Sequence, residues 1–264
     1  PDRAFHFQTI EFKNVCFRYP GTHKYILKNC SFLLSADKAY ALVGENGSGK
    51  STIIKLLTGL YSEYEGTIKI NGKSIKEYSY AELKSLISVA FQDYSKYDLS
   101  LWKNIQLGNL KQYDIKRIQK VLDDVGLLSF CNNLKHGLYT ELGKLEQENI
   151  DLSEGQWQRI EIARLLYANR EINILDEPTA ALDPVAEAQI YELFRQIRKN
   201  RFVIYITHRL GSAKTADEIL VLKDGHIAEQ GSHEELMSHP KGLYQTMYNI
   251  QKQLNQRNGE QVAT

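Results

Sequence analysis

A glycine-rich stretch carries the clearest chemistry in this sequence. Residues 44–51 match the pattern GxxxxGK[ST] and lie between an apolar run at 39–43 and a helical pattern of apolar residues that begins at Ile53. Glycines let successive backbone N–H groups turn inward, and the N-terminus of the following helix favours an anion. The stretch therefore predicts a phosphate-binding loop rather than an ordinary turn with a surface lysine.

Two side chains of this loop have separate expected roles. Lys50 would bring its charge to the β- and γ-phosphates of a nucleotide, and the Ser51 hydroxyl would be a ligand for Mg²⁺. The residues expected to bind the nucleotide here are Gly44, Glu45, Asn46, Gly47, Ser48, Gly49, Lys50, Ser51 and Thr52.

Two neighbouring carboxylates follow another apolar run. Asp176 and Glu177 come after residues 172–175, and open α/β sheets bind ligands at the carboxyl ends of their strands. We expect Asp176 to hold Mg²⁺, directly or through water, and Glu177 to polarise an attacking water as general base. The alternative is a solvated pair that caps the next segment, but the glycine-rich loop favours the metal and water roles.

A second helix start also suits a phosphate. Residues 152–156 read Leu-Ser-Glu-Gly-Gln before a helical stretch that ends near Tyr167, and Ser153 and Gln156 have the spacing of a capping box. Unpaired N–H groups and the helix dipole favour an anion there. Taken alone, an ordinary capped helix is the commoner explanation. Because Lys50 already belongs to a different phosphate cradle, the chain carries two half-sites.

Short strands and helices must position these groups. Alternating apolar residues predict strands between Thr9 and Val43, with a bulge near Asn14, and a hairpin at Asn71-Gly72. Another strand is expected over 86–91. A helix is expected from Ile115 to Val125, after a cap at Asp114. Strands are expected near 203–206 and 219–222. Ser232 and Glu235 predict a further capping box.

These patterns predict an α/β fold in one domain, 1–264. Its expected parts are a mainly antiparallel β subdomain (9–43), a nucleotide-binding core with a mostly parallel sheet (39–92 and 169–232), an inserted helical subdomain (93–168), C-terminal helices (233–255) and a frayed tail (256–264).

Composition narrows the possible functions. The 33 Lys and Arg residues nearly balance the 32 Asp and Glu residues, so no overall field favours nucleic acid or an anionic membrane. No apolar run approaches the ~20 residues that a membrane-spanning helix needs. Cys16, Cys30 and Cys131 form no CxxC pair, which is typical of small buried side chains in a reducing compartment.

Together the motifs resemble the ATP-binding domain of exporter-type ABC transporters over almost the whole chain. Residues 44–51 match the Walker A loop, Asp176 the Walker B aspartate, Glu177 the catalytic glutamate and 152–156 the family signature usually written LSGGQ. The resemblance implies a P-loop NTPase (RecA-like) core with antiparallel β and α-helical subdomains, an ATPase activity, and ATP and Mg²⁺ as the bound groups.

Four further positions rest on the resemblance. Tyr19 stands where an aromatic stacks on adenine, although packing alone would also explain it. Gln92 matches the Q-loop, which touches Mg²⁺ and faces the membrane domain, or is a surface amide. His208 matches the switch histidine expected at the γ-phosphate, or is a structural imidazole. Asp183 belongs to the D-loop and also suits a cap for the helix at Pro184.

The resemblance also implies partners. Two such domains, as a homodimer or heterodimer, would close around two ATP molecules, each site using one chain's Walker loops and the partner chain's Ser153, Gly155, Gln156 and Asp183. The other partner would be the membrane domain of an exporter, at the cytoplasmic face of the cell membrane, and Gln156-Trp157-Gln158 resembles bacterial peptide or bacteriocin exporters. The alternative is a soluble ABC-type ATPase acting on nucleic acid or ribosomes. No heptad insertion or basic stripe supports it, so no nucleic-acid partner is expected.

One departure from the signature has a chemical consequence. Glu154 stands where the family usually has glycine. A carboxylate directed at the partner's phosphate would cost up to a few kcal/mol, so we expect weaker ATP-driven closure with activity retained. Since the sequence lacks membrane helices and 231–244 resembles exporter C-termini, we also expect a fragment of a longer exporter rather than a separately encoded subunit.

Overall fold

A computed structural model describes residues 5–91, 93, 95–143, 149–178, 182, 184–197 and 202–261, with the backbone alone at 184, 195–197 and 255–261. The chain divides into two compact units, Pro1–Leu86 with Phe202–Thr264, and Ile87–Arg201. Each unit is described by itself.

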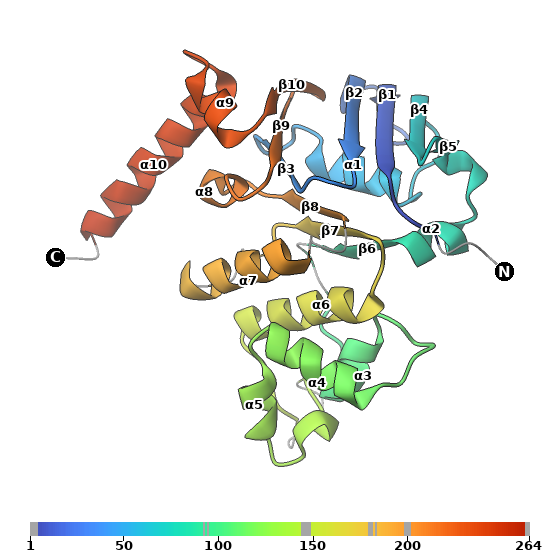
Figure 1. Ribbon diagram of the computed structural model, residues 1–264, viewed down its shortest axis with the longest axis vertical. Coiled ribbons are helices and arrows are strands. Elements are labelled where there is room, and N and C mark those ends of the chain that lie inside the picture. Colours follow the sequence, from blue (N-terminus) through green and yellow to red (C-terminus); the bar gives the residue numbers. More distant parts are fainter. Residues whose placement is uncertain are drawn as a thin grey trace. The chain divides into compact units, whose positions relative to one another are not determined.

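The first unit opens with an antiparallel sheet (Figure 1). Its strand order is β2-β1-β4-β5, formed by β1 (Thr9–Phe17), β2 (Leu27–Ser35), β4 (Glu65–Ile70) and β5 (Lys73–Ser74). The register of β1 shifts on either side of Asn14, whose φ is 50°, so the predicted bulge is confirmed. Asn71 and Gly72, at φ 50° and 77°, make the predicted hairpin between β4 and β5.

A second group of strands in this unit surrounds β3 (Tyr40–Gly44). β8 (Phe202–Ile206) and β9 (Glu218–Lys223) pair with it in parallel, and β10 (His226–Gly231) runs antiparallel to β9. All residues of β3 and β8 are buried, which explains their unbroken apolar runs. The helices of the unit are α1 (Lys50–Leu57), η1 (Ile75–Glu77), α2 (Tyr80–Leu86), α8 (Leu210–Ala213), α9 (His233–Ser238) and α10 (Leu243–Gln261).

The second unit is mostly helical. Strands β6 (Ile87–Ala90) and β7 (Ile172–Asp176) pair in parallel. The helices are α3 (Leu101–Gln106), α4 (Ile115–Asp124), α5 (Leu128–Asn132), η2 (Gly137–Tyr139), α6 (Glu154–Ala168) and α7 (Pro184–Ile197). The Asp114 carboxylate accepts the Arg117 N–H at 3.1 Å, so the predicted cap of α4 is confirmed.

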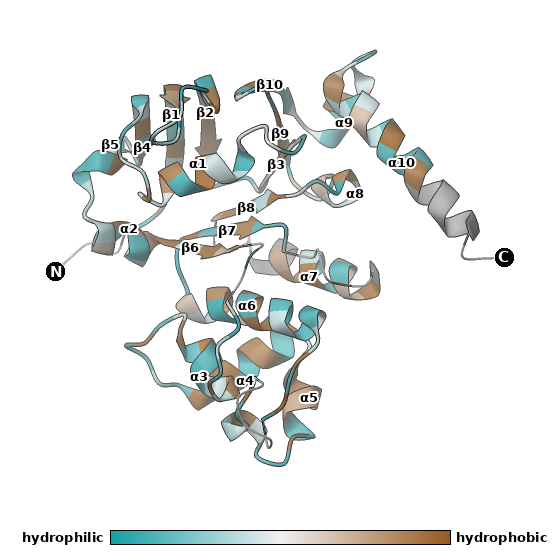
Figure 2. Ribbon diagram, turned by 180° about the vertical axis from the view of Figure 1, so that it is seen from behind, coloured by the Kyte–Doolittle hydropathy of each residue, from teal (hydrophilic) through white to brown (hydrophobic). Residues whose placement is uncertain are grey.

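Helix α6 is the centre of this unit, and Figure 2 shows hydrophilic and hydrophobic residues alternating along it. Its buried Arg164 donates to Asn104 O at 3.0 Å and to Ser95 O at 2.8 Å, which fastens α3 and the segment before it to α6. Glu161 pairs with Arg164 at 2.7 Å. Burial raises the pKa of Glu161, and the guanidinium opposes that shift.

Two boundaries differ from the sequence prediction. The strand expected over 86–91 is shorter, because Leu86 ends α2 and Phe91 is 38% exposed. Helix α10 continues to Gln261, beyond the predicted end of the C-terminal helices at 255. The polar residues of this stretch include Gln, Arg and Glu, which are good helix formers, so polarity alone was a poor sign of a frayed end.

All three cysteines are free thiols. Cys30 and Cys131 are buried, as expected, and Cys16 is half-buried beside Asn29. Burial raises the pKa of Cys30 to about 12, which keeps this thiol protonated and unreactive.

Candidate active site

The loop between β3 and α1 has a backbone that favours glycine. Gly44, Gly47 and Gly49 have φ values of 150°, 79° and 111°. A Cβ on Gly44 would lie 2.2 Å from Leu222 O, and one on Gly49 would lie 2.8 Å from Leu27 Cδ2. A Cβ on Gly47 would meet nothing within 4 Å, so this part of the loop borders open space. Packing fixes two of the glycines, and backbone conformation favours the third.

Polar groups of this loop fit a phosphate. The side chain of Lys50, a residue only 7% exposed, donates to Gly44 O at 2.8 Å and Glu45 O at 3.0 Å, so its charge is held against the loop. Among the described residues the buried Ser48 hydroxyl has no hydrogen-bond partner, which is costly unless something else supplies one. A bound phosphate would meet that hydroxyl and that charge in one cradle.

The residues next to the loop also fit Mg²⁺. The exposed Ser51 residue offers an oxygen of the kind Mg²⁺ prefers. Among the described residues there is no group of three or more His, Cys, Asp or Glu that could hold a metal by themselves. Mg²⁺ commonly uses one or two protein oxygens together with substrate phosphates.

Tyr19 lies beside the start of α1, two residues past the end of β1. Its hydroxyl is 3.0 Å from Thr52 Oγ1, and its ring packs edge-on against Phe17 and Tyr61. The Lys55 ammonium lies 5.4 Å from the ring centroid. The ring is half-buried in an aromatic cluster, so packing explains part of its environment, and adenine stacking stays a prediction.

His208 lies at the same sheet edge as the phosphate loop. It follows β8, and β8 pairs in parallel with β3, which leads into the loop. The preceding Thr207 donates its N–H to Leu42 O at 3.2 Å, while His208 itself is exposed. This placement permits the expected γ-phosphate contact, which stays a prediction.

The carboxylate pair lies in the second unit, at the end of β7. Asp176 is buried, and Glu177 follows with φ 51°, a conformation that non-glycine residues rarely adopt. The amide of Gln158, which is 3% exposed, donates to Glu177 O at 3.3 Å. We had no sequence argument for Gln158, although a glutamine next to Trp157 on a buried helix face was the available signal.

The signature segment forms the predicted capping box. Ser153 Oγ accepts the Gln156 N–H at 3.3 Å, and Gln156 Oε1 accepts the Ser153 N–H at 3.0 Å. Both side chains therefore serve the start of α6, while Gly155 is half-buried beside them. Their contact with a partner's nucleotide stays a prediction. Glu154 forms an ion pair with Lys96, a residue that the sequence reasoning did not consider.

Gln92 and Asp183 lie outside the described residues, so their proposed roles stay predictions. Of the other expected residues, Tyr19, residues 44–52 and His208 belong to the first unit, and Ser153, Gly155, Gln156, Asp176 and Glu177 to the second.

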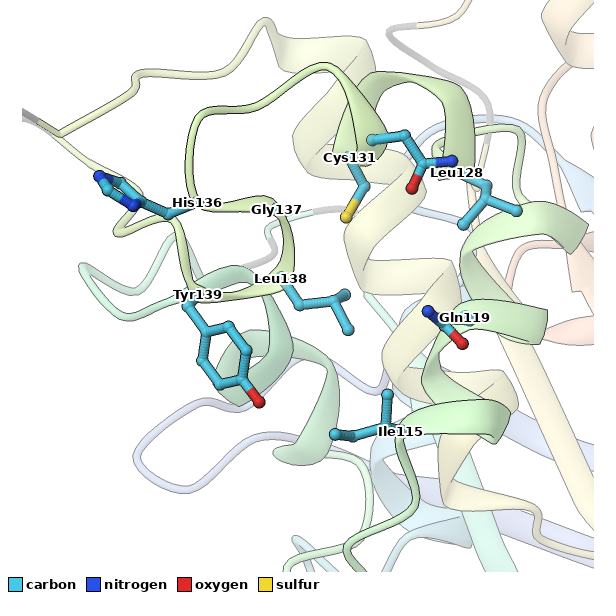
Figure 3. A pocket seen from close by; sticks show the side chains of 9 residues that line it. Ile115, Gln119, Leu128, Cys131, His136, Gly137, Leu138 and Tyr139 are labelled. Carbon is cyan, nitrogen blue, oxygen red and sulfur yellow. The ribbon is translucent and has the colours of Figure 1, made fainter.

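A pocket of about 340 Å³ lies elsewhere in the second unit, between α4, α5 and η2 (Figure 3). None of the residues that line it belongs to the motifs above. The His136 imidazole points away from the other labelled side chains, and Cys131 is buried. The pocket therefore lacks a convergent set of reactive groups.

Comparison with known proteins identifies the family. The family described as "ABC transporter" matches residues 27–180. The chain belongs to the ABC transporter family. Its ABC ATPase domain carries the α/β fold that the sequence predicted, and the predicted ATPase class is confirmed.

The similar proteins are transporter components. The chain is 40% identical over 247 residues to the "Nisin transport ATP-binding protein NisT" of Lactococcus lactis subsp. lactis, covering 92% of this chain and 40% of that protein. It is 41% identical over 230 residues to the "Subtilin transport ATP-binding protein SpaT" of Bacillus subtilis, covering 87% and 38%. It is 38% identical over 242 residues to the "ATP-dependent lipid A-core flippase" of Escherichia coli K12, covering 92% and 41%.

A solved structure agrees with these matches. "Structure of a bacterial Atm1-family ABC exporter with ATP bound" superimposes with a TM-score of 0.88 at 33% identity, covering 96% of this chain and 43% of that one. The chain of this ABC protein thus spans about two fifths of its relatives' length. In the described part of the chain, no helix has the length and apolar character to span a membrane. The predicted resemblance to bacteriocin exporters is confirmed by the nisin and subtilin proteins.

Proposed function

We propose that this domain binds and hydrolyses ATP to power export of a substrate across a membrane, by ATP-dependent pairing with a second such domain. It would act at the cytoplasmic face of the cell membrane, against the transmembrane domain of the exporter. The observation that carries the proposal is the phosphate cradle. There a glycine-rich loop is lined by the buried Lys50 ammonium and by the Ser48 hydroxyl, which has no hydrogen-bond partner in the part of the chain that the structure describes.

The predicted site residues of the first unit would bind the nucleotide. The N–H groups of 44–51 and the Lys50 ammonium would hold the β- and γ-phosphates, and the Tyr19 ring would stack on adenine. Lys50 already lies within 3.0 Å of two loop carbonyls, so it is oriented before substrate arrives. Pre-orientation lowers the cost of ordering a long side chain on binding.

Residues of both units would take part in hydrolysis. Glu177 would take a proton from the attacking water, and His208 of the first unit would donate a hydrogen bond to the γ-phosphate. Ser51, Asp176 and Gln92 would hold Mg²⁺, which when bound neutralises charge that develops on the β- and γ-phosphates. Ser153, Gly155, Gln156 and Asp183 would face the nucleotide of the paired domain.

The proposed cargo is a peptide. Two relatives carry nisin and subtilin transport in their names, and they align with 92% and 87% of this chain. The surfaces that select a cargo would belong to the transmembrane domain rather than to this one.

The test is ATP turnover by the purified 264-residue chain. Glu177→Gln should lower kcat by about 100-fold or more, because a transition-state group is lost, while ATP still binds. The Glu177→Gln variant should also elute as a dimer in size-exclusion chromatography when ATP is present. Glu63→Gln, which neutralises an exposed loop carboxylate, is the matched control and should behave as wild type.

Two results would contradict the proposal. Undiminished hydrolysis by Glu177→Gln would remove the carboxylate from the mechanism. Stimulation of turnover by nucleic acid, with no response to the membrane domain and a peptide, would favour the soluble alternative instead of export.

A further inference from the structure

A glutamine of the C-terminal helix binds the backbone that directly follows the His208 side chain. Gln251 Nε2 donates to His208 O at 2.8 Å, and Gln251 Oε1 accepts the Leu210 N–H at 2.6 Å. The two partners fix the orientation of the amide, because only its nitrogen can donate to a carbonyl and only its oxygen can accept from an N–H. The contact spans more than forty positions of the chain.

The Leu210 N–H has no hydrogen-bond acceptor within helix α8. Leu210 begins α8, and the N-cap residue Arg209 makes no side-chain hydrogen bond to cap the helix. The first N–H groups of a helix have no intrahelical partner. Gln251 therefore supplies, from α10, an acceptor for the first N–H group of α8.

The backbone before His208 is hydrogen-bonded to strand β3. Thr207 is buried, donates its N–H to Leu42 O of β3, and accepts the Arg209 N–H on its hydroxyl at 2.9 Å. The backbone is thus tied to the sheet before His208 and to α10 after it. The exposed His208 side chain projects from a segment that is anchored at both ends.

Helix α10 lies beside α8 and is itself held in place at its start (Figure 1). The two carboxylate oxygens of Glu229 accept hydrogen bonds from the first N–H groups of α10, those of Leu243 at 2.6 Å and Tyr244 at 2.9 Å. Tyr244 is fully buried, and its hydroxyl is 2.9 Å from His233 Nδ1 of α9. Gln251 follows Tyr244 by two helical turns, so the two side chains share one face of α10.

We propose that Gln251 is a positioning residue for ATP hydrolysis, which acts through His208 by fixing the backbone of the loop that carries it. The inference rests on the proposed role of His208 at the γ-phosphate. It gives α10 a part in hydrolysis through the loop that carries His208.

The first measurement reports the hydrogen bond without using activity. Amide hydrogen exchange of Leu210, followed by NMR, should be accelerated about tenfold or more in Gln251→Leu, because the N–H loses its acceptor. Gln253→Leu changes an exposed glutamine on the same helix and should leave this exchange rate as in wild type. Unchanged protection of Leu210 in Gln251→Leu would overturn the inference.

The second measurement tests the route through His208. Gln251→Leu should lower kcat about 10- to 100-fold with an unchanged KM for ATP, since small misplacements of catalytic groups have effects of this size. In a His208→Ala background the same substitution should have no further effect. Gln251→Glu has the size of glutamine but can no longer donate to His208 O, so it should also lower kcat.

The outcomes separate the inference from the proposed function. If His208→Ala turns over like wild type, the proposed role of His208 is wrong and the inference falls with it. If His208→Ala is slow while Gln251→Leu is as fast as wild type, the inference alone is wrong. An equal loss from Gln251→Leu in both backgrounds would likewise overturn it, because the effect would not pass through His208.

Discussion

Glu177 combines a proposed chemical role with an unfavourable backbone. Its φ of 51° lies in the left-handed region, where a residue with a Cβ loses about 1–2 kcal/mol. The amide of Gln158, a buried residue of α6, donates to the Glu177 carbonyl. Strain of this kind persists where neighbours hold it and concentrates at functional sites. The backbone conformation thus supports the carboxylate role independently of the motif.

Comparing two substitutions isolates this strain. Glu177→Gly and Glu177→Ala both remove the carboxylate, so both should abolish hydrolysis. Glycine relieves about 1–2 kcal/mol of strain and costs about 0.5–1 kcal/mol in chain entropy, so Glu177→Gly should be about 0–1.5 kcal/mol more stable than Glu177→Ala in urea denaturation. At Gln253 of α10 the order should reverse. If Glu177→Gly is instead less stable than Glu177→Ala by about 0.5–1 kcal/mol, as expected at Gln253, the turn is unstrained.

The Lys96–Glu154 ion pair alters the expected effect of having Glu154 where the family signature usually has glycine. Both side chains are exposed, by 42% and 65%, so the pair adds little to folding stability. It does place a positive charge against the carboxylate that we expect to weaken closure. Glu154 also sits in the first turn of α6, where the helix dipole favours an acid.

We therefore predict that Lys96→Ala weakens ATP-driven dimerisation and that Glu154→Gly strengthens it. Removing the lysine takes one positive charge away from the carboxylate near the partner's phosphate, whereas removing the carboxylate removes the repulsion. Combining the two changes should cancel most of the Lys96→Ala effect. ATP-dependent dimerisation measured by analytical ultracentrifugation gives the three values. Additive effects of the two substitutions would contradict the idea that Lys96 acts through Glu154.

At the scale of elements, the crossing of α3 and α6 depends on a glycine that the motifs do not include. A Cβ on Gly108 would lie 2.1 Å from Arg164 O and 3.0 Å from Arg164 C, both backbone atoms. Gly108→Ala should therefore push the two helices apart and destabilise the second unit by about 1–3 kcal/mol in chemical denaturation.

Gly211→Ala is the matched control. Gly211 also lies outside the left-handed region, within α8, and its added Cβ would meet nothing within 4 Å. This variant should be neutral or slightly more stable than wild type. Wild-type stability of Gly108→Ala would mean that the helices can separate at no cost.

Local chemistry explains which elements the sequence could predict. The Ser153–Gln156 and Ser232–Glu235 capping boxes, the Asp114 cap and the Asn71-Gly72 hairpin involve residues at most three apart, and all are present. The position of the glycine-rich loop between β3 and α1 was predictable because its residues are neighbours in the sequence.

Contacts between distant residues were not predictable. Arg164 reaches Asn104 across 60 positions, Lys96 reaches Glu154 across 58, and Gln251 reaches His208 across 43. A surface glutamine and a glutamine that holds a loop look alike in a sequence, because only the tertiary packing decides which partners they meet. Gln158 was missed for this reason too.

At the scale of the whole molecule, the two proposed half-sites predict that two chains work as a pair. Lys50 belongs to the loop of one compact unit, and Ser153 caps a helix of the other. If a working site needs Lys50 of one chain and Ser153 of the partner chain, two different defects can complement each other. Lys50→Ala and Ser153→Arg should each be inactive alone as purified chains.

An equal mixture of these two variants should recover hydrolysis. In a mixed dimer, one site takes Lys50 from the Ser153→Arg chain and Ser153 from the Lys50→Ala chain, so that site is intact. Half of the dimers are mixed, and each has one intact site of two, so the mixture should reach about a quarter of wild-type turnover if the sites act independently. Loss of the Ser153 cap costs α6 about 1 kcal/mol, which leaves the chain folded.

A third variant supplies the control for the mixture. The double variant Lys50→Ala/Ser153→Arg mixed with Lys50→Ala also forms mixed dimers, but every site in them lacks Lys50. That mixture should stay at background, so recovery in the first mixture cannot come from mixing alone. If the first mixture hydrolyses ATP no faster than the control, each chain must complete its own site, and the paired arrangement would have to be given up.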